Sequence, residues 1–222
     1  MAIRDEGIRY DASLEAISQV RLLTEGGRLT AASASQICDG AAGVMVAPPG
    51  TVKTNEQIVA YFDMVNETLG AKVPWVLQDH PVATGVQMSP DVILKILKNS
   101  PQCVMLKHED WPGLGKLSAV CQAIQKGDLQ KISILTGNGG GLFLPEELVR
   151  GANGAMTGFA YPEMMVDVVR THAAGDVERA HDLFDAYLPV SRYEQQAGIG
   201  LVVRKHLLAQ RGVIASAAIR KP

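Results

Sequence analysis

The sequence contains few cysteines, no long apolar segment and no secretory signal. Its three cysteines are Cys38, Cys103 and Cys121, an odd number without short paired spacings, so neither a disulfide framework nor a zinc ribbon is expected. No stretch approaches the roughly 18 apolar residues of a membrane-spanning helix. Residues 1–6 lack the apolar centre of a secretory signal. We therefore expect a cytoplasmic protein that does not interact with membranes.

The sequence also lacks a block of like charge. Its 222 residues include 21 Lys and Arg against 23 Asp and Glu, and the two signs are interspersed. A nucleic-acid-binding protein usually carries a basic patch, so the predicted partners are a small molecule and copies of the same chain. No set of His, Asp and Glu has the spacing of metal ligands, and no metal or cofactor is predicted.

From residue 43 onward, short apolar runs alternate with amphipathic helical patterns. The runs occupy residues 43–48, 73–77, 103–106, 132–136 and 154–158. This alternation is typical of βα units that build a parallel sheet. Because the runs are almost continuously apolar, we expect both faces of the sheet to be covered.

Capping signals mark where the intervening helices begin. Thr54 with Gln57 three residues later has the spacing of a capping box, and Ser89 followed by Pro90 predicts a cap and a first helical residue. Further helices are predicted from residue 114 to Gly127, over residues 145–150, and from residue 162.

Three segments are predicted along the chain. Residues 1–42 are mainly helical, with patterns around Leu14 and from Ala31 to Cys38, and they contain no convincing strand. Residues 43–175 carry five recognisable βα units, whereas a closed (β/α)₈ barrel needs eight strands and about 250 residues. Residues 176–222 have only helical patterns. The predicted fold class is α/β, a partial TIM (β/α) barrel with a C-terminal helical extension.

Lys107 follows an otherwise apolar strand. Ligands of parallel βα folds bind at the carboxyl ends of the strands, so polar residues at these positions are candidates for a site. An ammonium group is costly to bury, and a neutral amine can attack a carbonyl carbon to form a Schiff base. Alternatively, Lys107 extends past the strand and pairs with Glu109 or Asp110 in solvent. The residues alone support both interpretations equally.

Two further motifs lie at strand ends. The Gly137-Asn138-Gly139-Gly140-Gly141 loop could bring backbone N–H groups to a carboxylate or phosphate, or it could be a tight turn that needs positive φ. It matches neither the Rossmann pattern nor a P-loop. Asp79 and His80 could serve as an acid–base pair. Because adjacent strand residues point to opposite faces, at most one of them can face a common site.

Taken together, several segments resemble the dihydrodipicolinate synthase / N-acetylneuraminate lyase family over roughly residues 40–222. The segments are Val46-Ala47-Pro48, Leu77 to Gly85, Met105-Leu106-Lys107, Thr136-Gly137-Asn138 and Gly154 to Gly158. The resemblance implies a (β/α)₈ barrel, usually tetrameric, in which Lys107 forms a Schiff base with pyruvate or a related 2-oxo acid. The substrate-binding residues that it implies are Gln78, Asp79, His80, Thr136, Gly137, Asn138 and Thr157.

Three departures from the family pattern bear on the mechanism. Gln78 stands where the proton-relay tyrosine is usual, and an amide is neither an acid nor a base. Ala83 stands where many members hold a substrate carboxylate with arginine. The first three strands, with their carboxylate-binding loop, have no counterpart in residues 1–38. We therefore expect a different oxo acid as substrate, with Asp79, His80 or water moving the proton. We also expect the N-terminal helices or a partner to cover the open barrel.

The predicted function is a Schiff-base-forming lyase, an aldolase or dehydratase that acts on pyruvate-like 2-oxo acids or sugar-derived acids. It would use Lys107 and assemble as a homo-oligomer, either a tetramer or a dimer. One alternative is a truncated, catalytically silent family member that acts as a binding or assembly subunit. Another is an anion-binding module built on the glycine loop. These interpretations differ in whether a carbonyl substrate reaches a neutral Lys107.

Overall fold

The computed structural model describes residues 13–21, 25–26 and 43–219. The chain divides into two units, residues 1–42 and 43–222, and each is described by itself. In the first unit, α1 (Leu14–Ser18) begins where Ser13 Oγ accepts a hydrogen bond from Ala16 N, which confirms the helical pattern around Leu14. The helix predicted from Ala31 to Cys38, and Cys38 itself, lie outside the described residues.

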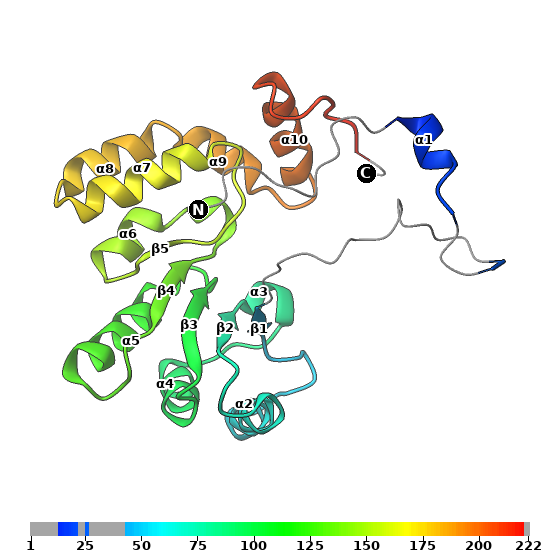
Figure 1. Cartoon of the computed structure of the whole chain (residues 1–222). Helices are drawn as coiled ribbons and strands as arrows, with labels where there is room; N and C mark the ends of the chain where they lie inside the picture. The colour runs from blue at the N-terminus through cyan, green and yellow to red at the C-terminus, as the bar shows by residue number, and fades with distance from the viewer. Residues whose placement is uncertain (1–12, 22–24, 27–42, 220–222) are drawn as a thin grey trace. The chain divides into compact units, whose positions relative to one another are not determined.

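The larger unit is built on a parallel sheet whose five strands follow one another in sequence order (Figure 1). The strands are β1 (Val44–Val46), β2 (Trp75–Asp79), β3 (Cys103–His108), β4 (Ser133–Thr136) and β5 (Gly154–Ala155). Sequential parallel strands joined by helices are the arrangement found in a TIM barrel. The predicted partial (β/α) barrel is thus confirmed, although β5 is shorter than the run predicted over residues 154–158.

The helices that join the strands are α2 (Asn55–Leu69), α3 (Pro81–Thr84), α4 (Pro90–Asn99), α5 (Leu114–Lys126) and α6 (Leu144–Val149), which follows the 3₁₀ turn η1 (Gly139–Gly141). Two of them, α2 and α4, begin at the predicted caps. Thr54 and Gln57 form the complete capping box, and Ser89 Oγ accepts from Val92 N. Only the single turn α3, which ends at Gly85 in the left-handed conformation, was not predicted.

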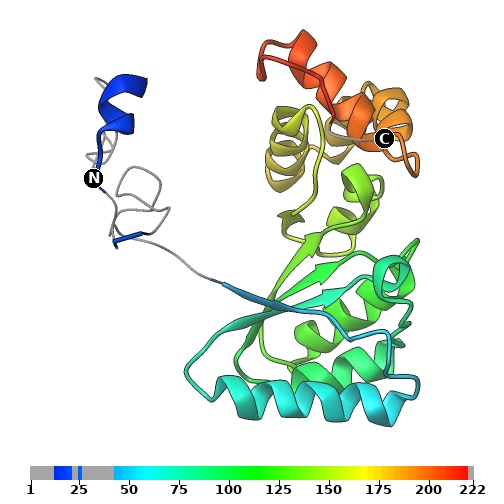
Figure 2. The ribbon, with the colours of Figure 1, turned by 90° about the vertical axis from the view of Figure 1, so that its right-hand side faces the viewer.

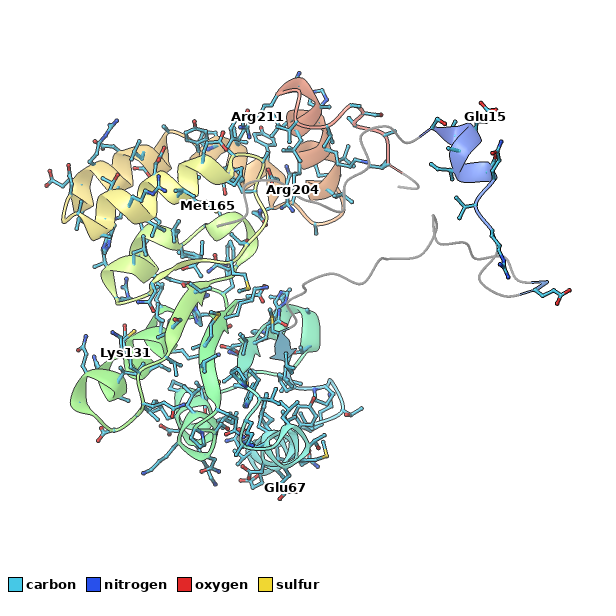
Figure 3. All side chains as sticks on the ribbon, viewed as in Figure 1. Glu15, Glu67, Lys131, Met165, Arg204 and Arg211 are labelled. Carbon is cyan, nitrogen blue, oxygen red and sulfur yellow. The ribbon has the colours of Figure 1, made fainter. Side chains whose placement is uncertain are left out.

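Four helices complete the unit after β5, namely α7 (Pro162–Ala173), α8 (Val177–Asp185), α9 (Leu188–Glu194) and α10 (Gly200–Gln210). Two arginines, both labelled in Figure 3, tie the last helix to the loop after β5. Arg204 pairs with the buried Glu194 and donates to Gly158 O, while Arg211 donates to Ala160 O and covers the Tyr161 ring. Among the described helices, none is long and apolar enough to cross a membrane.

Burial alternates along the strands, because the helices α2, α4 and α5 gather on one side of the sheet (Figure 2). Residues on that face are fully or almost fully buried, among them Trp75, Leu77, Cys103, Leu106 and Ile134. On the other face, Met45 is 42% exposed, and Val76, Met105 and Leu135 are only partly buried. The prediction that both faces are covered is therefore wrong for the described residues. Its basis, near-continuous apolar sequence, does not reveal which face the helices occupy.

Candidate functional site

Lys107 lies near the end of β3, on the face of the sheet that the helices leave open. The strand register pairs Lys107 with Gln78 of β2, so the two side chains point to the same side. Glu109, two residues further on, returns to that side, and its Oε1 lies 3.1 Å from Lys107 Nζ. Gln78 Nε2 donates to the same oxygen at 2.5 Å. The Lys107 and Glu109 side chains are only 16% and 8% exposed, so their ion pair forms largely inside the protein.

Asp79 and His80 diverge at the end of β2. His80 Nδ1 lies 3.6 Å from Glu109 Oε2, on the Lys107 side. Asp79 is fully buried on the other face, where its Oδ2 accepts from Lys116 Nζ at 2.7 Å. The two neighbours therefore face different sites, and His80 is the one close to the Lys107–Glu109 pair.

Lys116 lies in the first turn of α5 between two carboxylates, since its Nζ is also 2.8 Å from Asp110 Oδ2. Burial raises the pKa of Asp79, even though the Lys116 charge opposes this. Burial acts in the same direction on Asp110, but the hydrogen bonds and charge of Lys116, with a hydrogen bond from Gln87, bring the pKa of Asp110 below its usual value. Lys116 was not among the residues predicted from the sequence. Its signal is helical spacing, because Lys116 lies four residues before the buried Val120.

Glu147 of α6 is a buried carboxylate that gathers three polar side chains. It accepts from Thr136 Oγ1 at 2.8 Å and from Asn138 Nδ2 at 2.9 Å, and His108 Nδ1 lies 3.1 Å away. Two predicted substrate-binding residues, Thr136 and Asn138, thus direct their side chains to Glu147. Thr157 Oγ1 donates to Asn138 O at 3.1 Å and ties the next strand end to the same loop. Glu147 is a further residue that sequence analysis missed.

Gly137 makes room for the Lys107–Glu109 pair. A Cβ at this position would collide with Glu109 Cγ and would lie 2.9 Å from Lys107 Cε. Its φ is not positive, whereas Gly141 in the same loop has φ +66°. The loop therefore needs glycine for close approach at one position and for backbone conformation at another. Gly137 N donates to His108 O at 2.7 Å, so this N–H group extends the sheet hydrogen bonding.

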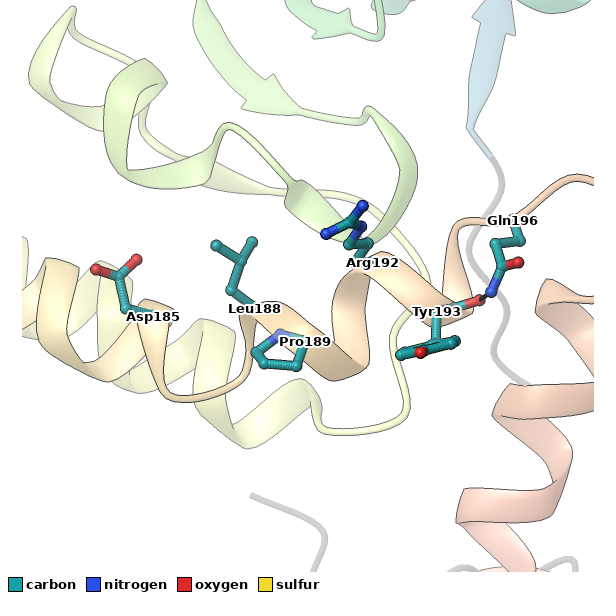
Figure 4. A pocket seen from close by; sticks show the side chains of 6 residues that line it. All are labelled: Asp185, Leu188, Pro189, Arg192, Tyr193 and Gln196. Atoms are coloured by element: carbon teal, nitrogen blue, oxygen red, sulfur yellow. Dashed lines mark hydrogen bonds between the residues drawn. The ribbon is translucent and has the colours of Figure 1, made fainter.

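Other features of the described residues contribute less to this site. A surface groove on the C-terminal helices, shown in Figure 4, is lined by Asp185, Leu188, Pro189, Arg192, Tyr193 and Gln196, and Lys107 does not reach it. Burial raises the pKa of Cys103 to about 11, which keeps this thiol protonated and unreactive at neutral pH. The described residues contain no group of three or more His, Cys, Asp or Glu placed to hold a metal ion.

A comparison with models of known protein families shows to which family the chain belongs. The model of the dihydrodipicolinate synthetase family matches residues 16–222. The chain belongs to this family. The resemblance noted in the sequence is thereby confirmed.

Curated relatives of this dihydrodipicolinate synthetase family member include two enzymes that act on different compounds. The L-2-keto-3-deoxyarabonate dehydratase of Azospirillum brasilense is 28% identical over 191 residues, which cover 82% of this chain and 58% of the dehydratase. The 4-hydroxy-tetrahydrodipicolinate synthase of Methanosphaerula palustris is 28% identical over 156 residues, 69% of this chain and 50% of the synthase. A steroid 3-ketoacyl-CoA thiolase of Mycobacterium tuberculosis matches 49 residues at 55% identity, 22% of this chain and 12% of the thiolase.

Solved structures agree with the family assignment. The dihydrodipicolinate synthase of Rhodopseudomonas palustris superposes with a TM-score of 0.77 at 55% identity, over 82% of this chain and 60% of that one. The enzyme of Thermotoga maritima superposes with a TM-score of 0.68 at 21% identity, over 82% and 60%, and shows the shared fold alone. This family member thus spans about 60% of the length of these two solved relatives.

Proposed function

We propose that this chain is a Schiff-base-forming lyase that uses Lys107 to attack the carbonyl of a 2-oxo acid. The observation that carries the proposal is the position of Lys107, near the C-terminal end of the central strand and on the uncovered face of a parallel sheet. This is the end of a (β/α) barrel at which active sites lie. Membership of a family whose relatives include a dehydratase and a synthase supports an enzyme of this type.

The chemistry begins when the neutral Lys107 Nζ bonds to C2 of the oxo acid and forms a carbinolamine. Loss of water from this adduct leaves a cationic imine, which withdraws electrons from C3. Such an electron sink serves two outcomes, cleavage of the C3–C4 bond in an aldolase or loss of a C4 hydroxyl in a dehydratase. We propose pyruvate-like or sugar-derived 2-oxo acids as the substrate class, including 2-keto-3-deoxy acids of the kind named for the Azospirillum relative.

The residues around Lys107 divide into two groups under this proposal. Gln78, His80 and Gly137 surround the Lys107–Glu109 pair and would contact the substrate. Asp79, Thr136 and Asn138 direct their side chains to Lys116 or Glu147, so they would shape the site from behind. The polar side chains close to the amine therefore come mainly from the end of β2 and from Glu109.

The remaining expectations stay predictions. They comprise the cytoplasmic location, a homo-oligomer that is a tetramer or a dimer, and activity without a cofactor. The alternative of a catalytically silent subunit receives no support from the relatives described above, since each is named as an enzyme. The silent-subunit alternative would be favoured only if a folded chain forms no borohydride-trapped adduct with a 2-oxo acid.

Borohydride trapping tests the proposal directly. The purified chain is incubated with pyruvate or with L-2-keto-3-deoxyarabonate, reduced, and analysed by peptide mass spectrometry. We expect a mass increase on the peptide that carries Lys107, because reduction converts the imine into a stable amine. The ranking of the two compounds would indicate the preferred substrate.

Two variants complete the trapping experiment. Lys107→Ala should lose the adduct, whereas Lys131→Ala, which changes an exposed lysine in the loop before β4, should retain it. Circular dichroism checks that each variant is folded. A folded wild-type chain that forms no adduct with either compound would contradict the proposed function.

A further inference from the structure

The proposed function leaves open which group moves protons at the imine, since Gln78 is neither an acid nor a base. Asp79, one candidate from the sequence, lies on the opposite face with Lys116. Among the described residues, Glu109 is the acidic side chain within 4.0 Å of Lys107 Nζ. From this geometry we infer that Glu109 is the acid–base catalyst of the Lys107 site, an inference that rests on the proposed function.

The contacts of Glu109 suit this role. One carboxylate oxygen, Oε1, faces Lys107 Nζ at 3.1 Å and accepts from Gln78 Nε2 at 2.5 Å. The other oxygen, Oε2, lies 3.6 Å from His80 Nδ1. These contacts fix the carboxylate beside the nucleophile, and its side chain is 8% exposed, so it is largely shielded from bulk water. A group that is held in place and desolvated at hydrogen-bond distance is what proton transfer requires.

Glu109 can act first on the lysine. An ammonium group has no electron pair with which to attack a carbonyl. The 3.1 Å contact allows the Lys107 proton to pass to Glu109, which frees the neutral amine. That proton then leaves with the carbinolamine oxygen as water, and the carboxylate is restored when the imine forms. No co-reactant is needed for these steps.

The restored carboxylate can then act on the substrate. It takes a proton from C3 of the iminium, the C–H electron pair becomes the C2–C3 double bond of an enamine, and the nitrogen loses its positive charge. Return of a proton from Glu109 to C3 reverses the step. If C4 carries a hydroxyl, the enamine electrons instead form a C3–C4 double bond while the C4–O bond breaks, and Glu109 supplies the proton that turns the leaving oxygen into water.

Gln78 has a distinct part in this scheme. Its amide donates to Glu109 Oε1 and thereby orients the carboxylate, so Gln78 is a positioning residue. The other carboxylate oxygen, Glu109 Oε2, lies near His80, whose side chain is 33% exposed and therefore in contact with solvent. The absence of an acid or base at position 78 is thus offset by a carboxylate two residues after the lysine.

Exchange of the pyruvate C3 protons in D₂O, followed by NMR, separates proton transfer from imine formation. The full chain should exchange these protons for deuterium. Glu109→Gln preserves the size of the side chain but is not a base, so exchange should fall by about 100-fold or more, the range in which general bases contribute. Borohydride trapping on Lys107 should be slower in this variant but should reach the same final extent after long incubation, because water can replace Glu109 in the proton transfers of imine formation. Glu109→Asp should retain part of the exchange.

Glu67→Gln, a change at an exposed position of α2, is the matched control and should exchange like the unmodified chain. If Glu109→Gln exchanges within about threefold of the unmodified chain while trapping persists, the inference about Glu109 is overturned and the proposed function stands. If folded Glu109→Gln gives no adduct even after long incubation, Glu109 serves to place Lys107, and the inference is again overturned. If the unmodified chain neither traps nor exchanges, the proposed function and the inference fail together.

Discussion

An ion pair next to a nucleophilic lysine poses a specific physical problem. A carboxylate 3.1 Å from Nζ forms an ion pair with an ammonium group, and an ammonium group cannot attack a carbonyl. The same carboxylate is also the base that can remove the proton, provided that the distance between the two groups is maintained. The position of the Glu109 side chain is therefore as important for this site as its charge.

Gly137 maintains that position, and replacing it tests how strictly the site depends on it. In Gly137→Ala, the new methyl group would overlap Glu109 Cγ and press on Lys107 Cε, so one or both side chains must move. We expect the rate of borohydride trapping to fall by about 100-fold, because displacements near 1 Å have effects of that order. Single-turnover trapping with pyruvate measures this rate.

Gly154→Ala is the control for this experiment. Gly154 is also a buried glycine of the sheet, but a Cβ there would meet only Leu135 Cδ2, at an ordinary contact distance of 3.6 Å. The Gly154→Ala variant should therefore trap pyruvate at close to the rate of the unmodified chain. Equal rates in Gly137→Ala and the unmodified chain would mean that the site tolerates displacement of the pair.

At the scale of elements, the start of α5 combines two glycines with opposite requirements. Gly113, the N-cap, has φ +48°, and a Cβ there would lie 2.5 Å from His108 Nε2. Gly115, within the first turn, has no heavy atom within 4 Å of an added Cβ. An added methyl group should therefore change the free energy of unfolding differently at these two positions, although they are only two residues apart.

We expect Gly113→Ala to lower the free energy of unfolding by about 1–3 kcal/mol, since strain and overpacking add at this residue. Gly115→Ala should raise it by about 0.5 kcal/mol, because alanine reduces the entropy of the unfolded chain and favours the helix. Urea unfolding of both variants beside the unmodified chain measures the difference. If both variants were destabilised by a similar amount, the expected difference between Gly113 and Gly115 would be contradicted.

The elements that sequence analysis predicted are those with local signals. Thr54 with Gln57, and Ser89 with Pro90, satisfy backbone groups only a few residues away, so their spacing alone predicts where α2 and α4 begin. The parallel order also follows from local alternation of strands and helices. The position of Lys107 at a strand end was likewise predicted from local pattern, whereas its role as the Schiff-base lysine came from the family resemblance.

The contacts that were not predicted from the sequence join distant segments. Alternation along the strand places Glu109 on the same side as Lys107, but its contact with Gln78 depends on the register of β3 against β2. Glu147 is stabilised by side chains from residues 9 to 39 positions away. Local periodicity carries no information about such pairings.

At the scale of the whole unit, the sheet separates two kinds of polar chemistry. Its open face carries the Lys107–Glu109 pair, and its helix-covered face carries Lys116 between Asp79 and Asp110. Asp79 and Asp110 on the covered face are both buried. A buried carboxylate that has no cationic partner destabilises the folded state. We therefore expect Lys116 to contribute more to stability than an exposed lysine does.

The two carboxylates respond to pH in opposite directions. Burial raises the pKa of Asp79, so ionised Asp79 favours unfolding, and stability increases as the pH falls through its folded-state pKa. Asp110 has a lowered pKa, so its contribution to stability is present above its unfolded-state pKa and is lost as the pH falls through its folded-state pKa. The gain from Asp79 therefore falls above the ordinary pKa of an aspartate and the loss from Asp110 falls below it, and at neutral pH the two contributions to stability have opposite signs.

Removing the cation should break this balance. In Lys116→Met, both carboxylates lose their partner, and we expect the free energy of unfolding at about pH 7 to fall by about 3–5 kcal/mol. The deficit should shrink between about pH 7 and about pH 5, because without the lysine both pKa values rise and protonation removes the uncompensated charge. Lys131→Met, at an exposed position, should change stability by less than about 0.5 kcal/mol at either pH. Urea unfolding at the two pH values measures these differences, and a Lys116→Met deficit that stayed constant with pH would show that the buried carboxylates do not titrate as burial and charge require.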